Sequence, residues 1–393
     1  MKSVFALCLL FTATIVHAQP TLSDSAEISV ITCGPWQHEL YSAFGHSAFR
    51  VYDPEHGIDD AYNYGVFDFN QPNFYLNFAR GYLNYKLGVY DYQRFRDYYI
   101  YYNRYVHEQR LNLTQQEKQK LYEYLIWNAL PENQYYRYDY FFDNCATKIR
   151  DVIAEVFGEN VRFDGSYVNT DYSFRELTDI YLAQQPWGDL GIDIGLGLPI
   201  DRQAMPYEYM FLPDYIESGF NHAFIKSDGV EKPLVRETIS VYEVREAEPE
   251  GGLPHPLLIF GVLLAIAFAI TLWDFKRKKI SNWFDGILFG IVGLIGLLLL
   301  SLWLFTDHHA AARNLNLLWA WPTHLVAVVG LMTRPKWLRG YFLINEVALG
   351  AVLLFWFLLP QDLNTALIPV ALTLLLRAFA QHWLRRAAPA QGR

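Results

Sequence analysis

The chain has 393 residues, of which 52% are hydrophobic, and its formal net charge is −9. The two halves differ, because 27 of the 28 tyrosines precede residue 254, and residues 254–393 carry a net charge of +7 against −16 for the rest. One soluble globular domain would not divide in this way. The acidic first half argues against a general binder of phosphate backbones, and the apolar second half has the composition of a membrane domain.

The first residues predict a secretory signal peptide. Lys2 supplies the positive start, residues 4–16 form a short apolar core, and Ala18 ends the segment with a small residue. Such a core is too short to cross a hydrocarbon layer about 30 Å thick comfortably. We therefore expect residues 1–18 to be removed, and residues 19–253 to form a domain outside the cytoplasm.

Residues 254–393 predict an all-α membrane domain of five transmembrane helices. The basic connections between its apolar runs alternate with connections that are poor in lysine and arginine, so the first run should begin outside and the C-terminus should lie in the cytoplasm. Arg377 lies within the last run and is expected to face protein or to reach the interface. The five apolar runs cover about 256–273, 284–305, 317–333, 341–359 and 365–384.

Residues 19–253 predict one α+β domain. Alternating apolar residues around a turn predict a β-hairpin over 46–69. The capping-box sequence Thr114-Gln115-Gln116-Glu117 predicts a helix that ends near Leu130. A strand pattern returns at 234–244. Helices and strands in this order indicate the α+β class.

Cys145 stands at the start of the clearest predicted helix, which Gly158 can end. Asn144 is a good N-cap and puts Cys145 in the first helical turn. The helix dipole and the free backbone N–H groups there favour the thiolate, which is the reactive form. The alternatives are a buried inert cysteine and a disulfide with Cys33. One apolar helix face follows Cys145 and consists of Ile149, Val152, Ile153, Val156 and Phe157.

His46 is the histidine best placed to serve such a thiol. It begins the first hairpin strand, and a thiol nucleophile needs an imidazole that is itself oriented by a polar partner. The second strand offers Asn63 and Asp68. A symmetric loop over 53–60 would place His46 opposite about residue 67, which favours Asp68, but a slipped register would change this. Asn63 could instead only hydrogen-bond the loop, and the two are ranked as equal candidates. The sequence contains no zinc-ligand spacing, phosphate-binding glycine loop or Gly-x-Ser-x-Gly elbow, and no metal or cofactor is expected.

Several motifs resemble those of the Lnb-type family. In the first half the similar segments are YSAFGHSAFRV (41–51), YNYGVFDF (62–69), LNLT (111–114), YDYFFDNCATKIRD (138–151), LPIDR (198–202) and FLP (211–213). In the second half they are TDH (306–308) and NLNLLW (314–319). The resemblance covers nearly the whole mature chain.

The resemblance implies a lipoprotein N-acyltransferase of Bacteroidetes-type bacteria, located in the inner membrane. It implies a periplasmic domain with a circularly permuted, papain-like fold of the NlpC type, and the permutation explains why His46 precedes Cys145. Cys145 would be the nucleophile and His46 the base. The acyl donor would be a membrane phospholipid, and the acceptor would be the α-amine of the N-terminal diacylglyceryl-cysteine of a lipoprotein.

Further residues are expected to contact substrate. The apolar side chains of segment 186–219 are expected either to touch acyl chains or to form an ordinary core hairpin with loops. The polar residues of the outer loop would complete the site or a head-group contact, or else satisfy the backbone of their own loop. The candidate substrate-binding residues are Asn144, Arg50, His308, Asn314 and Asn316.

Two other functions stay open from the sequence. A membrane-tethered cysteine peptidase or amidase acting on cell-wall peptide would use the same Cys145 and His46 with water as the acceptor, although five spans exceed what a tether needs. A non-catalytic membrane sensor or assembly protein would keep Cys145 as a structural residue. A disulfide between Cys33 and Cys145 would support that alternative.

Overall fold

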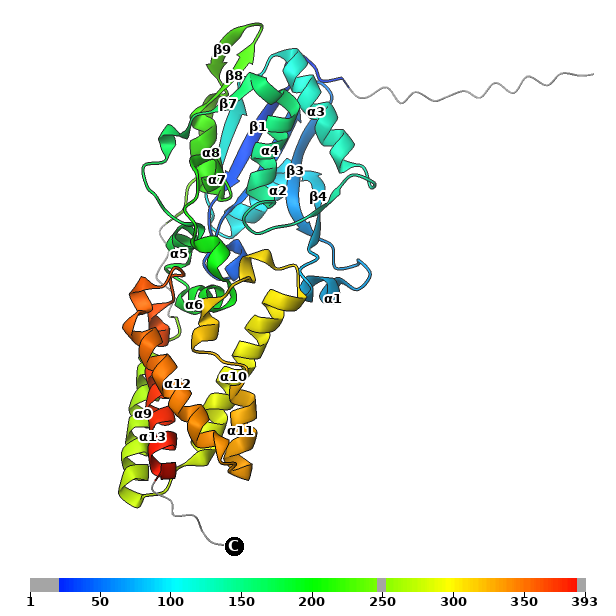
Figure 1. Ribbon diagram of the computed structural model, residues 1–393. Helices are drawn as coiled ribbons and strands as arrows, with labels where there is room; N and C mark the ends of the chain where they lie inside the picture. Colours follow the sequence, from blue (N-terminus) through cyan, green and yellow to red (C-terminus); the bar gives the residue numbers. More distant parts are fainter. Residues whose placement is uncertain (1–20, 246–251, 387–393) are drawn as a thin grey trace, which may run out of the picture.

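Figure 1 shows a computed structural model of the chain, in which residues 21–245 and 252–386 are described. An α+β domain stands on a bundle of long helices, so the predicted division near residue 253 separates two structural units. The expected signal peptide, residues 1–18, lies outside the described residues.

A seven-stranded antiparallel sheet forms the centre of the first domain, with the strand order β10-β5-β1-β2-β3-β4-β6. Its strands are β1 (Glu27–Cys33), β2 (His46–Asp53), β3 (Ile58–Phe67), β4 (Asn84–Asp91), β5 (Val106–Leu111), β6 (Tyr135–Arg137) and β10 (Val235–Tyr242). A smaller sheet contains β7 (Val161–Phe163), β8 (Ala223–Ser227) and β9 (Val230–Pro233). The predicted hairpin and the returning strand near 234–244 are confirmed.

The first domain contains eight α-helices among the described residues, and of these α4 and α2 pack on opposite faces of the large sheet. The eight helices are α1 (Phe74–Ala79), α2 (Tyr92–Tyr101), α3 (Gln115–Ala129), α4 (Cys145–Phe157), α5 (Phe174–Leu182), α6 (Pro186–Gly195), α7 (Pro206–Tyr209) and α8 (Pro213–Asn221). Thr114 caps α3 through the predicted capping box, and Leu130 ends it. Segment 186–219 therefore forms three helices and a 3-10 turn in place of the hairpin considered from the sequence.

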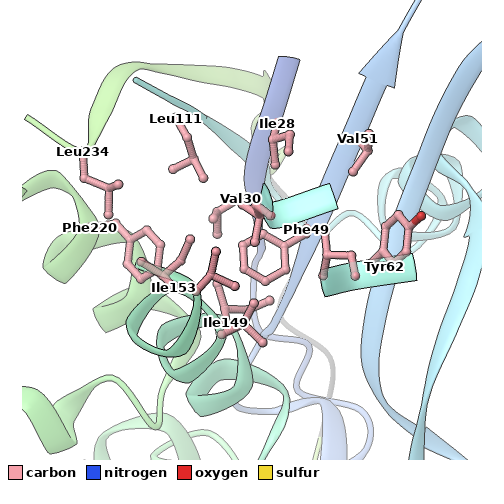
Figure 2. Close-up of a cluster of buried hydrophobic side chains, with 14 of the residues drawn as sticks. Ile28, Val30, Phe49, Val51, Tyr62, Leu111, Ile149, Ile153, Phe220 and Leu234 are labelled. Atoms are coloured by element: carbon pink, nitrogen blue, oxygen red, sulfur yellow. The ribbon is translucent and has the colours of Figure 1, made fainter. Parts of the chain in front are cut away.

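The strands divide their side chains between two cores because successive residues point to opposite faces. Phe49 and Val51 of β2 face α4, where Figure 2 shows them with Ile149 and Ile153. Ala48, on the other face, packs with the aromatic side of α2. The helix carrying Cys145 is thus held on the sheet by its predicted apolar face.

The second domain contains α9 (Pro256–Arg277), α10 (Asn282–Phe305), α11 (His324–Thr333), α12 (Trp337–Leu354) and α13 (Ile368–Arg386). Among the described residues, four helices are long and apolar enough to cross a membrane: Pro256–Arg277, Asn282–Phe305, Trp337–Leu354 and Thr365–Arg385. The predicted count of five such helices is not confirmed. The third apolar run is helical only over the ten residues of α11, which span about 15 Å at 1.5 Å per residue.

The non-helical part of this third run and the first turn of α11 lie against small residues of α10. A Cβ atom added at Gly296 would lie 2.0 Å from the carbonyl oxygen of Ala320, and one added at Gly293 would lie 3.0 Å from the backbone nitrogen of Leu325. Trp319 and Ala320 are buried. Irregular backbone is tolerated at membrane depth where protein covers it. Here α10 covers the non-helical residues that precede the short helix α11.

Arg377 faces protein and not lipid. Its Nε atom lies 2.6 Å from Asp285 Oδ1, and its Nη2 atom lies 2.8 Å from Asp274 Oδ2. All three side chains are fully buried. A buried arginine is tolerated when charged partners satisfy its donors, and here it ties α13 to α9 and α10.

We expect Arg377→Leu to destabilise the helical domain strongly, because it leaves two buried carboxylates without their partner, at a cost of about 3–5 kcal/mol. The exposed Arg339 offers a matched control, since Arg339→Leu removes a cation without breaking a buried pair. Thermal unfolding of both purified variants in the same detergent checks this. Equal melting temperatures for the two variants would contradict the structural role of Arg377.

Candidate active site

Asn144 fixes the start of α4 and with it the position of Cys145. Its Oδ1 accepts hydrogen bonds from the N–H groups of Ala146 (2.8 Å) and Thr147 (2.9 Å), which confirms the predicted N-cap. Its Nδ2 donates to the carbonyl oxygens of Tyr140 and Phe211, both at 2.8 Å. The expected substrate-binding role of Asn144 therefore has no free polar atom to serve it, and its contacts position the helix.

The thiol of Cys145 occupies the place where β2 and β3 stop pairing. Their ladder ends at the pair Phe49 and Tyr62, before His46 and the end of β3 are reached. The N–H of Ser47 donates a hydrogen bond to the sulfur. Gly65 has φ +85°, and a Cβ atom added there would lie 3.4 Å from Cys145 Cβ. The end of the hairpin thus packs closely against Cys145.

His46 is oriented by Asn63. The distance from His46 Nε2 to Asn63 Oδ1 is 2.5 Å, and the imidazole stacks on Tyr99 with an interplanar angle of 12°. With Nε2–H donating to this oxygen, the neutral ring carries its lone pair on Nδ1. Nδ1 forms no hydrogen bond with any described residue, including Cys145. Hydrogen bonds between catalytic groups often form only when substrate is bound.

The register of the hairpin explains why Asn63, and not Asp68, meets the histidine. Asp53 pairs with Ile58, so the turn is shorter than the symmetric loop considered from the sequence. Continuing that register places residue 65 opposite His46, and Asn63 then lies one diagonal step away. Asp68 instead accepts a hydrogen bond from the hydroxyl of Tyr135 at 2.6 Å and lies 3.5 Å from Lys86 Nζ.

Removal from water keeps both central groups neutral at rest. Burial lowers the pKa of His46 to about 4, although its hydrogen bond with Asn63 acts in the opposite direction. Burial raises the pKa of Cys145 to about 11, although the N–H groups around the sulfur lower it. The backbone N–H groups at the helix start do favour the thiolate, as expected, but they do not decide the resting state of Cys145. Desolvation outweighs the backbone donors.

Arg104 and Tyr136 stand beside the site without having been singled out from the sequence. Arg104 is buried and donates from Nε to the carbonyl oxygen of Gly34 at 2.6 Å, and its positive charge lowers the pKa of both His46 and Cys145. The hydroxyl oxygen of Tyr136 is buried and has no hydrogen-bond partner among the described residues. Both lie in tyrosine-rich stretches, where one residue carries no distinguishing signal.

Arg50 has a structural role in place of the expected contact with substrate. Its Nε lies 2.7 Å from Asp59 Oδ1, and its Nη1 lies 2.9 Å from Glu108 Oε2. Its guanidinium lies 3.8 Å from the centre of the Tyr92 ring. At about 3.3 Å per residue, its position on β2 is roughly 13 Å along the strand from His46. Its N–H donors therefore bind neighbouring strands of the sheet.

Cys33 pairs with His46 across β1 and β2 and is fully buried. It and Cys145 are both free thiols. The disulfide that would support the non-catalytic alternative is therefore not formed in the structure. Burial raises the pKa of the Cys33 thiol well above its ordinary value, so this cysteine is unreactive at neutral pH.

The outer loop of the helical domain holds the two domains together. Asn314 and Asn316 are buried, and each donates a hydrogen bond of 2.8 Å to α6, at the carbonyl oxygens of Ile194 and Asp193 respectively. His308 Nε2 lies 3.1 Å from the carbonyl oxygen of Phe78. All three expected substrate contacts are thus engaged with backbone, although with that of the first domain and not with that of their own loop, which was the alternative considered.

One group of carboxylates has the spacing of a metal site, but its partners favour a shared proton. Oxygen atoms of Asp179, Asp189 and Asp193 lie within 4.8 Å of one another. Arg175 Nη1 already lies 2.6 Å from Asp193 Oδ1. Burial, together with the neighbouring carboxylates, raises the pKa of Asp179 to about 8 and that of Asp189 to about 6. At neutral pH the protonated Asp179 can therefore share its hydrogen with Asp189.

We expect slow alkylation of Cys145 at neutral pH, because only a small fraction of the thiol is ionised. The rate with iodoacetamide should rise about tenfold for each pH unit between roughly pH 6 and pH 10, as the thiolate fraction rises. Mass spectrometry of the labelled peptide checks this, and buried Cys33 serves as an internal control. A rate that is already constant below about pH 7 would contradict the neutral resting thiol.

Asn63→Ala should slow the reaction of Cys145 with a small activated ester, measured by mass spectrometry, by roughly 10- to 100-fold, because losing a buried hydrogen bond of this kind costs about 1–3 kcal/mol. Asp68→Ala is the matched comparison, since Asp68 lies near the same strand end without contacting His46. It should change the rate less than about threefold, as surface substitutions usually do. A larger loss with Asp68→Ala than with Asn63→Ala would overturn the assignment.

Comparison with family models gives two matches, one for each half of the chain. The Lnb N-terminal periplasmic domain matches residues 19–179, and the Lnb transmembrane domain matches residues 248–388. No curated protein and no solved structure matches the chain. The two matches occur in the order, and on the two domains, that the structure separates. The chain therefore belongs to the Lnb-type family and is a membrane protein with a periplasmic domain.

Proposed function

We propose that this chain is a lipoprotein N-acyltransferase in which Cys145 is the nucleophile. The observation that carries the proposal is a thiol at a helix start, beside an imidazole oriented by Asn63, at one end of the sheet. The same end leads into the membrane bundle, because β10 finishes at Tyr242 and the chain continues to α9 at Pro256. A circularly permuted papain-like arrangement is part of the proposal.

In the first step His46 Nδ1 takes the proton of the Cys145 thiol while the sulfur attacks the acyl ester of a phospholipid. Because both groups are neutral at rest, proton transfer accompanies the attack. The ester C–O bond breaks, and the imidazolium returns the proton to the departing oxygen. The products of this step are a lysophospholipid and an acyl thioester on Cys145.

In the second step the α-amine of a diacylglyceryl-cysteine attacks the thioester. His46 accepts the proton that the amine loses as the C–N bond forms, and the thiol leaves and recovers its proton. A free α-amine has an ordinary pKa of about 7.7–8.0, so part of it is already deprotonated at neutral pH. Shielding from water favours the amine over hydrolysis of the thioester.

Three donors are proposed for the oxyanion of each step. The N–H groups of Ser47 and Cys145 already lie within hydrogen-bond reach of the sulfur, and the hydroxyl of Tyr136 has no other partner among the described residues. The helix-start N–H groups of Ala146 and Thr147 are taken up by Asn144. Preorganised donors of this kind stabilise the charge that develops on the acyl oxygen.

Deletion of the gene should leave lipoproteins without their N-acyl chain. Wild-type chain should restore it, and Cys145→Ala should not, because no thioester can form. Mass spectrometry of lipoprotein N-terminal peptides checks this, with membrane levels of each variant measured in parallel. N-acylation that persists unchanged in the deletion would refute the proposal, and thiol-dependent release of cell-wall peptide would favour the peptidase or amidase alternative.

A further inference from the structure

A chain of contacting aromatic rings leads from the thiol to the helical domain. It begins at Gly65, where an added Cβ atom would lie 3.4 Å from Cys145 Cβ and 3.8 Å from the Tyr138 ring. Successive ring centres then lie 4.2, 4.4, 6.0, 4.9 and 6.2 Å apart. We call this set the aromatic track, in order Tyr138, Tyr85, Phe67, Phe69, Phe74 and Phe78.

The far end of the track is fixed where a membrane-spanning helix ends. The N–H of Asp307 donates to the carbonyl oxygen of Arg80 at 2.8 Å, and Arg137 Nη2 lies 2.6 Å from Asp307 Oδ2. Asp307 lies two residues beyond Phe305, the last residue of α10. Figure 1 accordingly shows α1 beside the upper end of α10. This places α1 at the boundary between the bilayer and the periplasm.

Helix α1 and the adjoining outer part of the track expose apolar side chains that protein packing does not explain. α1 contains no charged residue and no buried residue. Phe69 is 65% exposed, Tyr75 is 80% exposed and Leu76 is 54% exposed. A six-residue helix with nothing buried gains little from folding in water. Exposed aromatic and aliphatic side chains at this level are typical of a surface covered by lipid.

We propose that α1 inserts into the outer leaflet of the bilayer and that the aromatic track guides the acyl chain of a phospholipid to Cys145. This inference rests on the proposed acyl transfer and names its donor side: a long-chain phospholipid approached from within the membrane. Of the inner rings, Tyr85 is buried and Tyr138 is half-buried, and both form one wall of the route. The outer rings form the entrance, where they replace the water around the acyl chain with apolar contacts.

The membrane contact is tested without any activity. A spin label is placed at Tyr75→Cys in a Cys145→Ala background, in bilayers of phosphatidylethanolamine and phosphatidylglycerol; buried Cys33 does not take the label. Relaxation should be enhanced more by oxygen than by a water-soluble nickel chelate. A label at Val230→Cys, an exposed position on β9 at the opposite end of the domain, should show the reverse. Equal behaviour of the two labels would overturn the insertion.

The route is tested by comparing two acyl donors. Phe69→Asn combined with Leu76→Asn should lower lysophospholipid release from the same bilayers by about tenfold at low donor density, through a higher KM. Acylation of Cys145 by water-soluble para-nitrophenyl butyrate should stay within about twofold of the wild type, because this donor needs no route from the membrane. Val230→Asn is the control and should affect neither reaction.

Two results would overturn the route: an equal loss with both donors, which indicates general damage, or full activity with phospholipid. Failure of the proposed function has a different signature. The wild type itself would then release no lysophospholipid while still being acylated by the soluble ester. That result would refute both the proposed function and the acyl route. The spin-label experiment would still decide whether α1 enters the membrane.

Discussion

The geometry of the site depends on how Asn144 closes the first turn of α4. One side chain caps two backbone N–H groups and donates two hydrogen bonds to the carbonyl oxygens of Tyr140 and Phe211. The helix start is thereby fixed to two other segments, while its apolar face packs on the sheet. Only this arrangement brings the thiol of Cys145 to the gap at the end of β2 and β3, next to His46.

The same closeness of packing sets the chemistry of the site. Withdrawal from water shifts the pKa of the thiol upward and that of the imidazole downward, so both are uncharged before reaction. The charge of Arg104 moderates the first shift and adds to the second. A neutral pair is a weaker nucleophile than an ion pair. It suits the proposed acyl transfer, in which a thioester would have to meet an amine and avoid water, because the dry surroundings that suppress ionisation also limit hydrolysis.

Contacts between the two domains orient the candidate site toward the membrane. Asn314 and Asn316 bind the backbone of α6, and Asp307 and His308 bind the segment around α1. The hydrogen bonds of Asn314 and Asn316 are between buried groups and are costly to break, so the open end of the sheet is held toward the membrane. Within the helical domain, the ion pairs of Arg377 with Asp274 and Asp285 hold α13 against α9 and α10.

The sequence by itself determined what depends on neighbours along the chain: the caps of α3 and α4, the hairpin, the two-domain division and the apolar runs. It also singled out Cys145 and His46 as the candidates for the site. The choice of Asn63 over Asp68, the ion pairs of Arg50, the buried hydroxyl of Tyr136 and the short α11 were decided only by tertiary structure. Strand register, burial and the filling of space beside α10 are set by contacts between distant segments, and a local pattern contains no information about them. The raised pKa of Cys145 belongs to the same group, because a helix dipole is local whereas desolvation is the sum of everything packed around the thiol.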